Sequence, residues 1–461
     1  MSSAVDSDGL DPRVWQIAAV ACLGPFMTVL DSTVVNFSLG TIRQELHSSI
    51  TSAQWIVSAY LLALALMLPL SGWLVDRLGT KRLYLACFSA FTLASLGCGA
   101  ARSMEGLVAA RVLQGLAGGL LAPMAQMMMA RAAGRHMARV MGYTVVPILI
   151  APILGPVAAG AVLHVAGWPW LFYLNLPIGI LAVTLAFLLL PADGAAEQKR
   201  PFDLPGFLLI SPGLVCLLYG AEHATQPHGA LILLAGLLLL AAFGGYSLRR
   251  GSSALVDLRL FGNRTFSAAA ATQFLSNGQA FAGQFLVPLY LISGCGLSAT
   301  QAGWTLAPMG VGMMCSFPLM GFLTERFGCR AVSTGGALVA LLGTLPLLWM
   351  SGHVFSPMVA MVCMAVRGAG QGAIGIPSVS AAYAALPKEK LAVATTAINI
   401  VQRLGGPLAT TSMAIVMALA ATHWPAQSAG VFGVAFGLLI SLHLLVLVSA
   451  SRLPERVVHG A

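Results

Sequence analysis

The chain has 461 residues, of which 58% are hydrophobic and only 8% are charged. A soluble globular domain carries about 25% charged residues, so this composition excludes soluble enzymes and binding modules and indicates a polytopic membrane protein. The formal net charge of +9 does not indicate a nucleic-acid partner, because the basic residues lie in connections on one side of the predicted membrane.

Apolar segments recur along the whole chain and are joined by short connections. Each is close to the ~20 residues that a bilayer crossing needs. The sequence therefore predicts an all-α integral membrane protein, embedded in the lipid bilayer, with fourteen transmembrane helices. Their expected ranges are 14–37, 52–74, 82–101, 106–130, 138–163, 168–190, 204–223, 228–248, 265–292, 301–324, 331–350, 355–378, 392–420 and 429–451.

The basic residues predict the orientation of these segments. If residue 1 is cytoplasmic, the outer connections hold two basic residues, Arg43 and Arg102, and the inner connections hold nineteen. This distribution follows the positive-inside rule. We expect a multi-pass protein of the inner (cytoplasmic) membrane with both termini in the cytoplasm. The first thirteen residues carry three Asp and one Arg, unlike a signal peptide, so the first span should be retained.

Two charged turns that contain glycine indicate an internal repeat. The first is Gly72-Trp-Leu-Val-Asp-Arg-Leu-Gly-Thr-Lys-Arg82, and the second is Gly321-Phe-Leu-Thr-Glu-Arg-Phe-Gly-Cys-Arg330. From Gly72 to Gly321 the offset is 249 residues, a little over half the chain. Glycine permits the tight reversal between two helices, and two such turns at this offset predict a duplicated membrane protein.

The repeat also predicts the domain boundaries. Aligning the two turns pairs spans 1–6 with spans 9–14 and leaves spans 7 and 8 as an insertion. We therefore expect an N-terminal six-helix bundle at residues 1–191 and a C-terminal six-helix bundle at residues 265–461. Between them, residues 192–264 would form cytoplasmic linkers with two inserted transmembrane helices.

Three further patterns accompany these turns. Span 1 contains Leu30-Asp-Ser-Thr-Val-Val-Asn-Phe-Ser-Leu39, and span 4 contains Arg111-Val-Leu-Gln-Gly115. Span 5 carries a glycine and proline pattern at Gly142, Gly155, Pro156 and Gly160, with Ala151 and Ala159 in place of two further glycines. With these patterns in order on the expected spans, the chain resembles the major facilitator superfamily, and within it the fourteen-span drug:proton antiporter branch. The span-5 pattern resembles the antiporter motif of that branch.

The resemblance implies a major facilitator fold, with two six-helix bundles about a central cavity and two extra helices. It implies a transporter that exports amphipathic or hydrophobic small molecules by alternating access, in exchange for protons. The proton gradient would be the energy source and no cofactor is expected; the absence of a P-loop pattern argues against ATP. An alternative is a proton-coupled exporter of one specific metabolite or siderophore-like compound.

Other function classes find little support in the sequence. The nine histidines are scattered and the eight cysteines form no C-x-x-C pair, so we expect neither an enzyme nor a metal site. The short outer connections contain no evident docking module, so an envelope adaptor protein as partner stays an open question.

Ionisable residues within the spans are costly to bury and are therefore candidate functional residues. Asp31 in span 1 and Arg111 in span 4 both lie roughly 9 Å below the outer surface at ~1.5 Å per residue, so the two side chains are at a depth where they can pair. We expect Asp31 to take up a proton and Arg111 to respond to its charge. The alternative is a permanent structural ion pair. Glu222, near the outer end of span 7, is a candidate secondary proton site.

Polar residues at several other span positions are candidates for lining the substrate cavity, with hydrogen bonding between helices as the alternative. These residues are Asn36, Gln114, Gln126, Gln273, Asn277, Arg367 and Arg403. For Arg367 and Arg403 we expect mainly structural bonding to carbonyls or amides, such as those of Gln371, Asn399 and Gln402, because no Asp or Glu lies deep in the second half.

The two charged turns are interpreted as a gate. Charge pairs across them would hold the inner side shut in the outward-open state and would separate in the inward-open state, which makes the turns a bistable element. Anchoring of the topology alone is the alternative. The gating residues expected are Gly72, Asp76, Arg77 and Arg82 in the first turn and Gly321, Glu325, Arg326 and Arg330 in the second.

Overall fold

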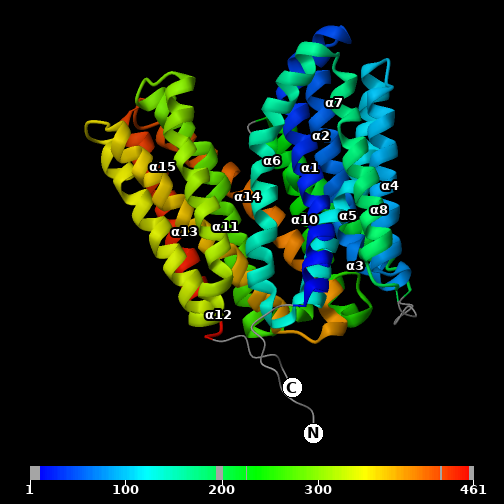
Figure 1. Ribbon diagram of the computed structural model, residues 1–461. Coiled ribbons are helices and arrows are strands. Elements are labelled where there is room, and N and C mark those ends of the chain that lie inside the picture. Colours follow the sequence, from blue (N-terminus) through cyan, green and yellow to red (C-terminus); the bar gives the residue numbers. More distant parts are fainter. Residues whose placement is uncertain (1–10, 194–200, 225, 426–427, 456–461) are drawn as a thin grey trace.

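The computed structural model describes residues 11–193, 201–224, 226–425 and 428–455, and all the regular secondary structure within these ranges is helical. Figure 1 shows two bundles that lie close together at the end of the molecule where α1 begins at Pro12, here called the terminus side, and that diverge towards the opposite end. Within the described ranges, twelve helices are long and apolar enough to cross a membrane.

The first bundle is built from the N-terminal part of the chain. Its second membrane-crossing segment is formed by α2, η1 and α3 in succession, and its last by α7 and α8. Its elements are α1 (Pro12–Glu45), α2 (Ile50–Met67), η1 (Leu68–Leu70), α3 (Ser71–Leu78), α4 (Thr80–Gly99), α5 (Met104–Ala133), η2 (Gly134–His136), α6 (Met137–Val165), α7 (Pro169–Tyr173) and α8 (Asn175–Leu189).

A helical hairpin follows, formed by α9 (Leu204–Glu222) and α10 (Pro227–Arg250). The two helices pack closely at Gly236, because glycine has no side chain there. A Cβ atom added at this residue would lie 2.5 Å from the backbone nitrogen of Leu217. α9 also touches both bundles: Trp55 of α2 stacks on Tyr219 with ring centroids 6.0 Å apart, and Thr411 of the C-terminal bundle donates a hydrogen bond to the Ala221 carbonyl (3.1 Å). The hairpin corresponds in sequence to the predicted insertion.

The second bundle begins after two short helical turns, and it repeats the order of the first. Its elements, with the two turns, are η3 (Gly251–Ser253), η4 (Leu258–Gly262), α11 (Arg264–Leu289), the π-helical turn η5 (Tyr290–Gly294), α12 (Ala299–Ser351), α13 (Pro357–Ala384), η6 (Lys388–Lys390), α14 (Leu391–Ala420) and α15 (Ala429–Ala450). α12 reverses its backbone at Gly328, which has φ 83° and ψ 165°, so it consists of two arms.

The two reversals confirm the repeat that the sequence predicts. Gly79 lies between α3 and α4 with φ 83° and ψ 161°, nearly the same conformation as Gly328, which is 249 residues further on. Side chains other than glycine are strained at such positive φ values. Each half therefore turns at the terminus side of the molecule through the same glycine conformation.

Local signals in the sequence explain where several helices begin. Asp11, Ser49 and Ser103 accept backbone hydrogen bonds at the starts of α1, α2 and α5, at 2.9, 3.0 and 3.1 Å. Ser298 and Gln301 form a reciprocal capping box at the start of α12. These caps satisfy backbone N–H groups that have no partner within the first helical turn.

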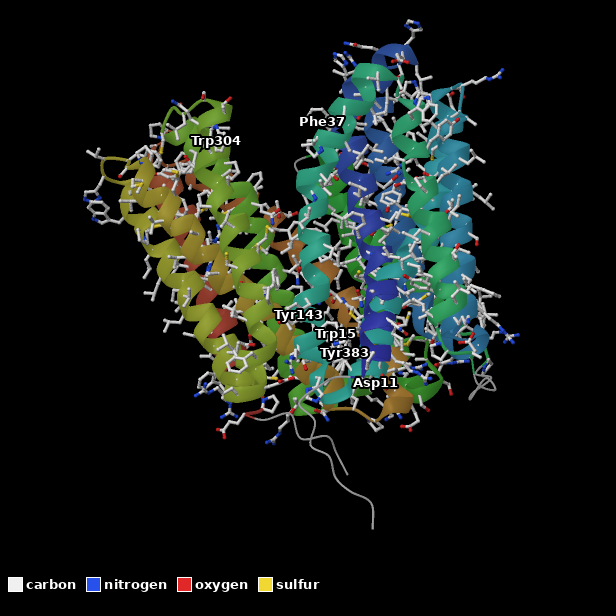
Figure 2. All side chains as sticks on the ribbon, in the orientation of Figure 1. Asp11, Trp15, Phe37, Tyr143, Trp304 and Tyr383 are labelled. Carbon is white, nitrogen blue, oxygen red and sulfur yellow. The ribbon has the colours of Figure 1, made fainter. Side chains whose placement is uncertain are left out.

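Within the first bundle, glycines of α5 allow its backbone to approach α2. A Cβ atom added at Gly119 would lie 2.5 Å from the carbonyl oxygen of Leu64, and one added at Gly115 would meet the carbonyl of Tyr60. In the same bundle Trp15 of α1 contacts Tyr143 of α6 edge to face, with ring centroids 5.5 Å apart (Figure 2). Small residues at helix interfaces are typical of membrane proteins, in which close packing drives helix association.

We predict that Gly119→Ala lowers the thermal stability of the detergent-purified protein, because the added methyl group must push α2 and α5 apart. Overpacking of this kind costs about 1–3 kcal/mol. Gly97→Ala is the matched control: its Cβ would meet only the Ala110 Cβ, at an ordinary 3.8 Å. Equal melting temperatures for the two variants would contradict this description of the α2–α5 contact.

Candidate functional site

A buried polar cluster lies between α1, α4, α5 and α8, with the carboxylate of Asp31 at its centre. Asp31 Oδ2 accepts a hydrogen bond from Arg111 Nη1 at 2.5 Å, while Oδ1 accepts from Gln114 Nε2 at 3.0 Å and from Asn175 Nδ2 at 2.7 Å. The exposed fractions of Asp31 and Arg111 are 2% and 0%. The structure thus places the two ionisable residues of spans 1 and 4 in direct contact.

The guanidinium of Arg111 is held from several sides. Its Nε donates to the Ile56 carbonyl of α2 at 3.1 Å, and its Nη1 also donates to Gln114 Oε1 at 2.6 Å. The ring of Tyr60, with its centroid 4.1 Å from Cζ, covers one face of the group. A cation over an aromatic face is stabilised electrostatically, and more strongly when both are desolvated. Arg111 therefore connects α5 with both α1 and α2.

Ser95 and Asn175 belong to this cluster, although the sequence analysis does not single them out. Asn175 Nδ2 and Gln114 Nε2 both donate to Ser95 Oγ, at 3.0 and 3.3 Å, and Ser95 Oγ donates to the Phe172 carbonyl at 2.9 Å. The available signal for Asn175 is an amide in an otherwise apolar run, at the first residue of α8. Serine is too common in helices for Ser95 to stand out.

Two other predicted residues lie apart from the cluster. Asn36 and Glu222 are both exposed, and among the described residues neither makes a hydrogen bond to the Asp31 cluster. Glu222 is the last residue of α9, at the end of the helix away from the chain termini. The structure therefore assembles one of the two predicted proton sites from buried groups and leaves the other at the surface.

Gln126 connects the two bundles. Its Oε1 accepts hydrogen bonds from Tyr383 of α13 at 3.0 Å and from Asn399 of α14 at 2.9 Å. Figure 2 shows Tyr383 near the terminus side of the molecule. The amide of Asn399, expected as a partner for a buried arginine, is thus part of a contact between bundles.

The polar residues of α11 bond within the second bundle. Gln273 Nε2 donates to the Gly375 carbonyl (2.7 Å) and to Ser378 Oγ (2.6 Å), and its Oε1 accepts from Gln402 (2.8 Å). Asn277 donates to the Gln273 carbonyl at 2.9 Å. The bonds of Gln273 hold α11 against α13 and α14, and the bond of Asn277 lies within α11.

The two arginines of the second bundle have different surroundings. Arg367 is 1% exposed and donates from Nη2 to the backbone carbonyl of Gln279 at 3.3 Å, so its partner is not one of the three expected amides. No carboxylate contacts Arg367 within the described part of the chain. Arg403, on α14, is half-buried and close enough to Tyr60 of α2 to interact with it electrostatically.

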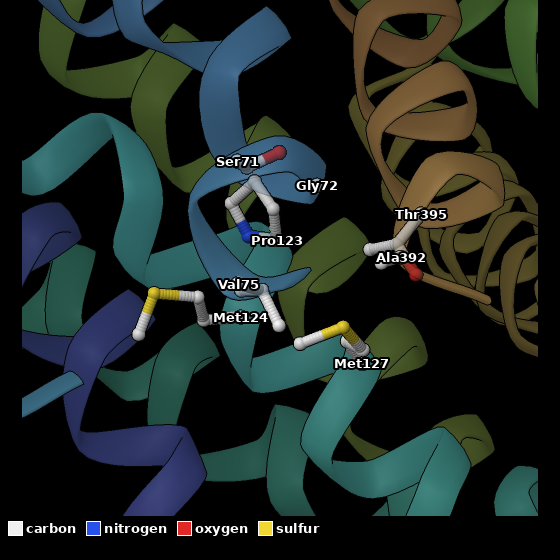
Figure 3. A pocket seen from close by; sticks show the side chains of 8 residues that line it. All are labelled: Ser71, Gly72, Val75, Pro123, Met124, Met127, Ala392 and Thr395. Carbon is white, nitrogen blue, oxygen red and sulfur yellow. The ribbon is translucent and has the colours of Figure 1, made fainter. Parts of the chain in front are cut away.

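The first charged turn forms a contact between bundles. The backbone N–H of Gly72 donates to Thr396 Oγ1 of α14 at 3.0 Å, and the hydroxyls of Ser71 and Thr396 are 2.8 Å apart. Figure 3 shows Ser71, Gly72 and Val75 facing Ala392 and Thr395. Gly72 has no room for a side chain, because a Cβ atom would lie 2.9 Å from Thr396 Oγ1.

The second charged turn makes the corresponding contact with α6. A Cβ atom added at Gly321 would meet the backbone of Arg139, and one added at Gly142 would lie 2.6 Å from the Phe317 carbonyl. Nearby, Glu325 contacts His136 with 2.7 Å between Oε1 and Nδ1. Each turn thus packs against the fifth helix of the opposite bundle, α14 or α6.

Residues of the two turns also contact connecting segments that were not among the predicted site residues. Arg330 pairs with Glu455 at 2.8 Å, and its backbone N–H donates to the Pro454 carbonyl. In the first turn, the backbone N–H groups of Lys81 and Arg82 donate to the carboxylate of Asp193 at 2.8 and 2.9 Å. In each half, the segment after the bundle's last helix binds the turn. Arg77 and Arg326 lie over the rings of Trp73 and Phe327, each 5.3 Å from the centroid.

The residues of the span-5 pattern serve different contacts along α6. Gly155 faces α1, where an added Cβ would meet the hydroxyl of Thr33, while Gly142 faces α12 as described above. Gly160 has no atom within 4 Å of an added Cβ. Pro156 is one of three prolines inside α6. The pattern therefore places α6 between its own bundle and the opposite one.

Comparisons with known proteins agree with this architecture. A family model described as Major Facilitator Superfamily matches residues 21–410. The chain is 33% identical over 425 residues to the Multidrug resistance protein B homolog of Mycobacterium tuberculosis. This match covers 90% of this chain and 78% of the relative.

Solved structures with the same fold include a crystal structure of a double tryptophan mutant of XylE, with a TM-score of 0.68 and 16% identity over 97% of both chains. Another is the human organic anion transporter MFSD10 (TETRAN), with a TM-score of 0.67 and 16% identity over 95% of this chain and 100% of that chain. At this identity the likeness concerns the fold alone.

We predict that Asp31→Ala destabilises the protein much more than Asp31→Asn. Both variants remove the counter-charge of Arg111, but alanine also removes the oxygens that accept from Arg111, Gln114 and Asn175. Breaking a buried pair with no replacement acceptor costs about 3–5 kcal/mol. Asparagine keeps an oxygen that accepts hydrogen bonds from Arg111. Melting temperatures of the purified variants measure the difference. A loss of stability as large for asparagine as for alanine would show that the negative charge itself, rather than hydrogen bonding, holds the cluster together.

Proposed function

Because this chain belongs to the major facilitator superfamily, we propose that it is a proton-coupled efflux transporter, a drug:H⁺ antiporter that exports amphipathic and hydrophobic compounds by alternating access. The name of the Mycobacterium tuberculosis relative supports drug efflux. The resemblance of the α6 pattern to the antiporter motif supports export in exchange for protons.

The observation that carries the proposal is the buried carboxylate of Asp31 with its three donors. A buried charge in a membrane is costly and marks a functional position. When Asp31 takes up a proton, its charge-assisted bond to Arg111 is lost, and such bonds are roughly twice as strong as neutral ones. Protonation therefore loosens the connection between α1 and α5, while Arg111 keeps its bonds to Gln114 and Ile56. This change would couple proton uptake to helix movement.

The contacts between bundles support alternating access. They gather at the terminus side, at Gln126, Ser71–Thr396 and Glu325–His136, while the bundles diverge at the other end (Figure 1). Rocking of one bundle against the other would open one side as it closes the other. With both termini in the cytoplasm, as the positive-inside rule favours, this conformation is outward-open and the charged turns form the inner gate.

The bonding of the candidate cavity residues supports a largely apolar substrate. Gln114, Gln126, Gln273 and Asn277 direct their polar groups to protein partners. Binding sites for hydrophobic compounds are lined mainly by apolar groups with a few polar ones that fix orientation. Asn36, Arg367 and Arg403 complete the proposed set of cavity residues, and Glu222 the proposed proton sites.

We also propose that fourteen helices cross the inner membrane. The two arms of α12, one before and one after the reversal at Gly328, would each be a separate crossing. α11 would be another, although its glutamines, Asn277 and hydroxyl residues lower its hydropathy and it is not among the twelve helices counted above. The bundles would then correspond to residues 1–191 and 265–461, with the α9–α10 hairpin in the linker between them.

Proton movement measured in proteoliposomes tests the proposal. We expect lipophilic compounds added outside to drive proton flux across membranes that contain the wild type, reported by a pH dye inside. Asp31→Asn should reduce this flux by at least tenfold while the substrate still binds. Glu105→Gln is a control, because Glu105 is exposed in the first turn of α5.

Other outcomes of this experiment would contradict parts of the proposal. Full flux in Asp31→Asn would place proton coupling elsewhere, and Glu222→Gln would be the next variant to measure. Flux with one compound of a panel and no competition among the others would favour an exporter of one specific metabolite.

A second experiment tests the inner gate. Thr396→Val removes the hydroxyl that bonds Ser71 and Gly72, and a net loss of about 0.5–1.5 kcal/mol per hydrogen bond predicts a several-fold shift towards the inward-open state. Thr410→Val is the matched control on the same helix, because in the described part of the chain that hydroxyl donates to the Gly406 carbonyl of its own helix and does not take part in the contact between bundles.

Double electron–electron resonance measures the distance between two spin labels. Labels at residues 131 and 389, attached to cysteines introduced into a chain without native cysteines, would report the opening at the terminus side. The same distance distribution in Thr396→Val and Thr410→Val would argue against a gating role of this contact.

A further inference from the structure

An apolar groove runs along the outside of the second bundle. It is bounded by the two arms of α12 and by α13. Its volume of about 660 Å³ is within the range of small-molecule sites, roughly 300–1,000 Å³. Small residues such as Gly335 and Ala369 line it, together with larger ones such as Leu319 and Phe327. Cys315 and Ser316 are its few polar side chains.

The groove faces away from the opposite bundle. Phe317 and Gly321 of α12 contact α6, whereas Leu319 and Leu323, each two residues further on, are turned by about 200° around the helix axis. Leu319 is 56% exposed. In a protein of this family such a surface is in contact with lipid rather than with the transport pathway.

The first bundle contains a related groove of about 520 Å³, lined by α2, α4 and α5. Its residues Met67 and Ala90 correspond to Ser316 and Val339 at the repeat offset of 249 residues, and Leu120 corresponds to Ala373 at the offset of 253 residues between α5 and α13. The grooves therefore arise from the same helix arrangement in both halves. They differ in length, because the groove of the second bundle continues to Phe327, next to the reversal at Gly328.

The dimensions of the longer groove match a lipid chain. From Gly312 to Phe327 it follows fifteen residues of helix, or about 22 Å at 1.5 Å per residue. One leaflet contributes about half of the ~30 Å hydrocarbon core. The groove thus extends from the terminus-side surface past the middle of the bilayer.

The charges at the mouth of this groove favour an anionic headgroup. Arg326 is exposed beside the ring of Phe327, and no carboxylate pairs with it in the part of the chain that the structure describes. The neighbouring Glu325 contacts His136, and Arg330 pairs with Glu455. Lipid tails are as apolar as the groove, so selectivity must come from close packing and from the headgroup.

We propose that this groove binds one anionic phospholipid of the terminus-side leaflet, with an acyl chain between the arms of α12 and α13 and its headgroup phosphate at Arg326. The site is separate from the Asp31 cluster and from the transport pathway. Its occupant would span the two arms on either side of the second charged turn.

Native mass spectrometry of the detergent-purified chain tests this proposal, with phosphatidylglycerol and phosphatidylcholine of identical acyl chains as probes. We expect one tightly retained phosphatidylglycerol in the wild type. Gly335→Leu should reduce that species at least fivefold by filling the groove, and the variant should fold, because no atom lies within 4 Å of a Cβ added at Gly335. Gly303→Leu, also on α12 with an open Cβ position, is the matched control.

A second pair of variants tests the headgroup site. Arg326→Gln should lower the preference for phosphatidylglycerol about fivefold, the contribution of one cationic residue near an anionic surface. Arg249→Gln removes an exposed positive charge near the same end of the molecule and should leave the preference unchanged.

Three results would overturn the proposal. The first is retention of the lipid by Gly335→Leu at the wild-type level, and the second is equal retention of both lipids by the wild type. The third is a wild-type dimer that disappears in Gly335→Leu, since a second copy of the chain would then occupy the groove.

Discussion

The N-terminal bundle depends on the burial of one charge pair. Taking a carboxylate and a guanidinium out of water costs several kcal/mol for each ion, and their attraction offsets this only when the remaining donors and acceptors are also satisfied. Gln114, Asn175 and the Ile56 carbonyl supply partners from three helices for Asp31 and for Nη1 and Nε of Arg111, whereas Nη2 of Arg111 has no hydrogen-bond partner in the described part of the chain. The positions of α1, α2, α5 and α8 are therefore fixed together, and a change in the charge of Asp31 affects all of them.

A second constraint is the close approach of backbones where the bundles meet. Gly72 lies against α14 and Gly321 against α6, and neither position has space for a Cβ atom. Each glycine precedes a reversal at φ 83°, at Gly79 or Gly328. The two turns thus combine a tight backbone reversal with an interface between bundles. This combination explains why the same short motif occurs in both halves at one offset.

The sequence was sufficient to predict the helical membrane fold, the repeat and the family, because hydropathy, turn glycines and local motifs are properties of neighbouring residues. It also placed Asp31 and Arg111 at the same depth. It did not identify Ser95 and Asn175, whose importance depends on which helix faces lie together. Arg367 bonds to a carbonyl, one of the two kinds of partner expected, but it reaches the backbone carbonyl of Gln279 and not one of the three residues named, because no residue type reveals which backbone group a side chain reaches. The two charged turns were recognised, but their contacts with Asp193, His136 and Glu455 involve segments distant in sequence.

The repeat gives an independent argument about the buried pair. Asp31 corresponds to Ala280 at the offset of 249 residues. The helices α5 and α13, which begin at Met104 and Pro357, correspond at 253 residues, so Arg111 corresponds to Met364; Ala280 and Met364 are both buried. The second bundle therefore builds the same arrangement of helices with buried apolar residues at the positions where the first has an ion pair. Replacing a buried ion pair by well-packed apolar residues is often neutral or stabilising. The architecture does not require the pair, and its presence in one bundle is consistent with a role in proton coupling that the other bundle does not share.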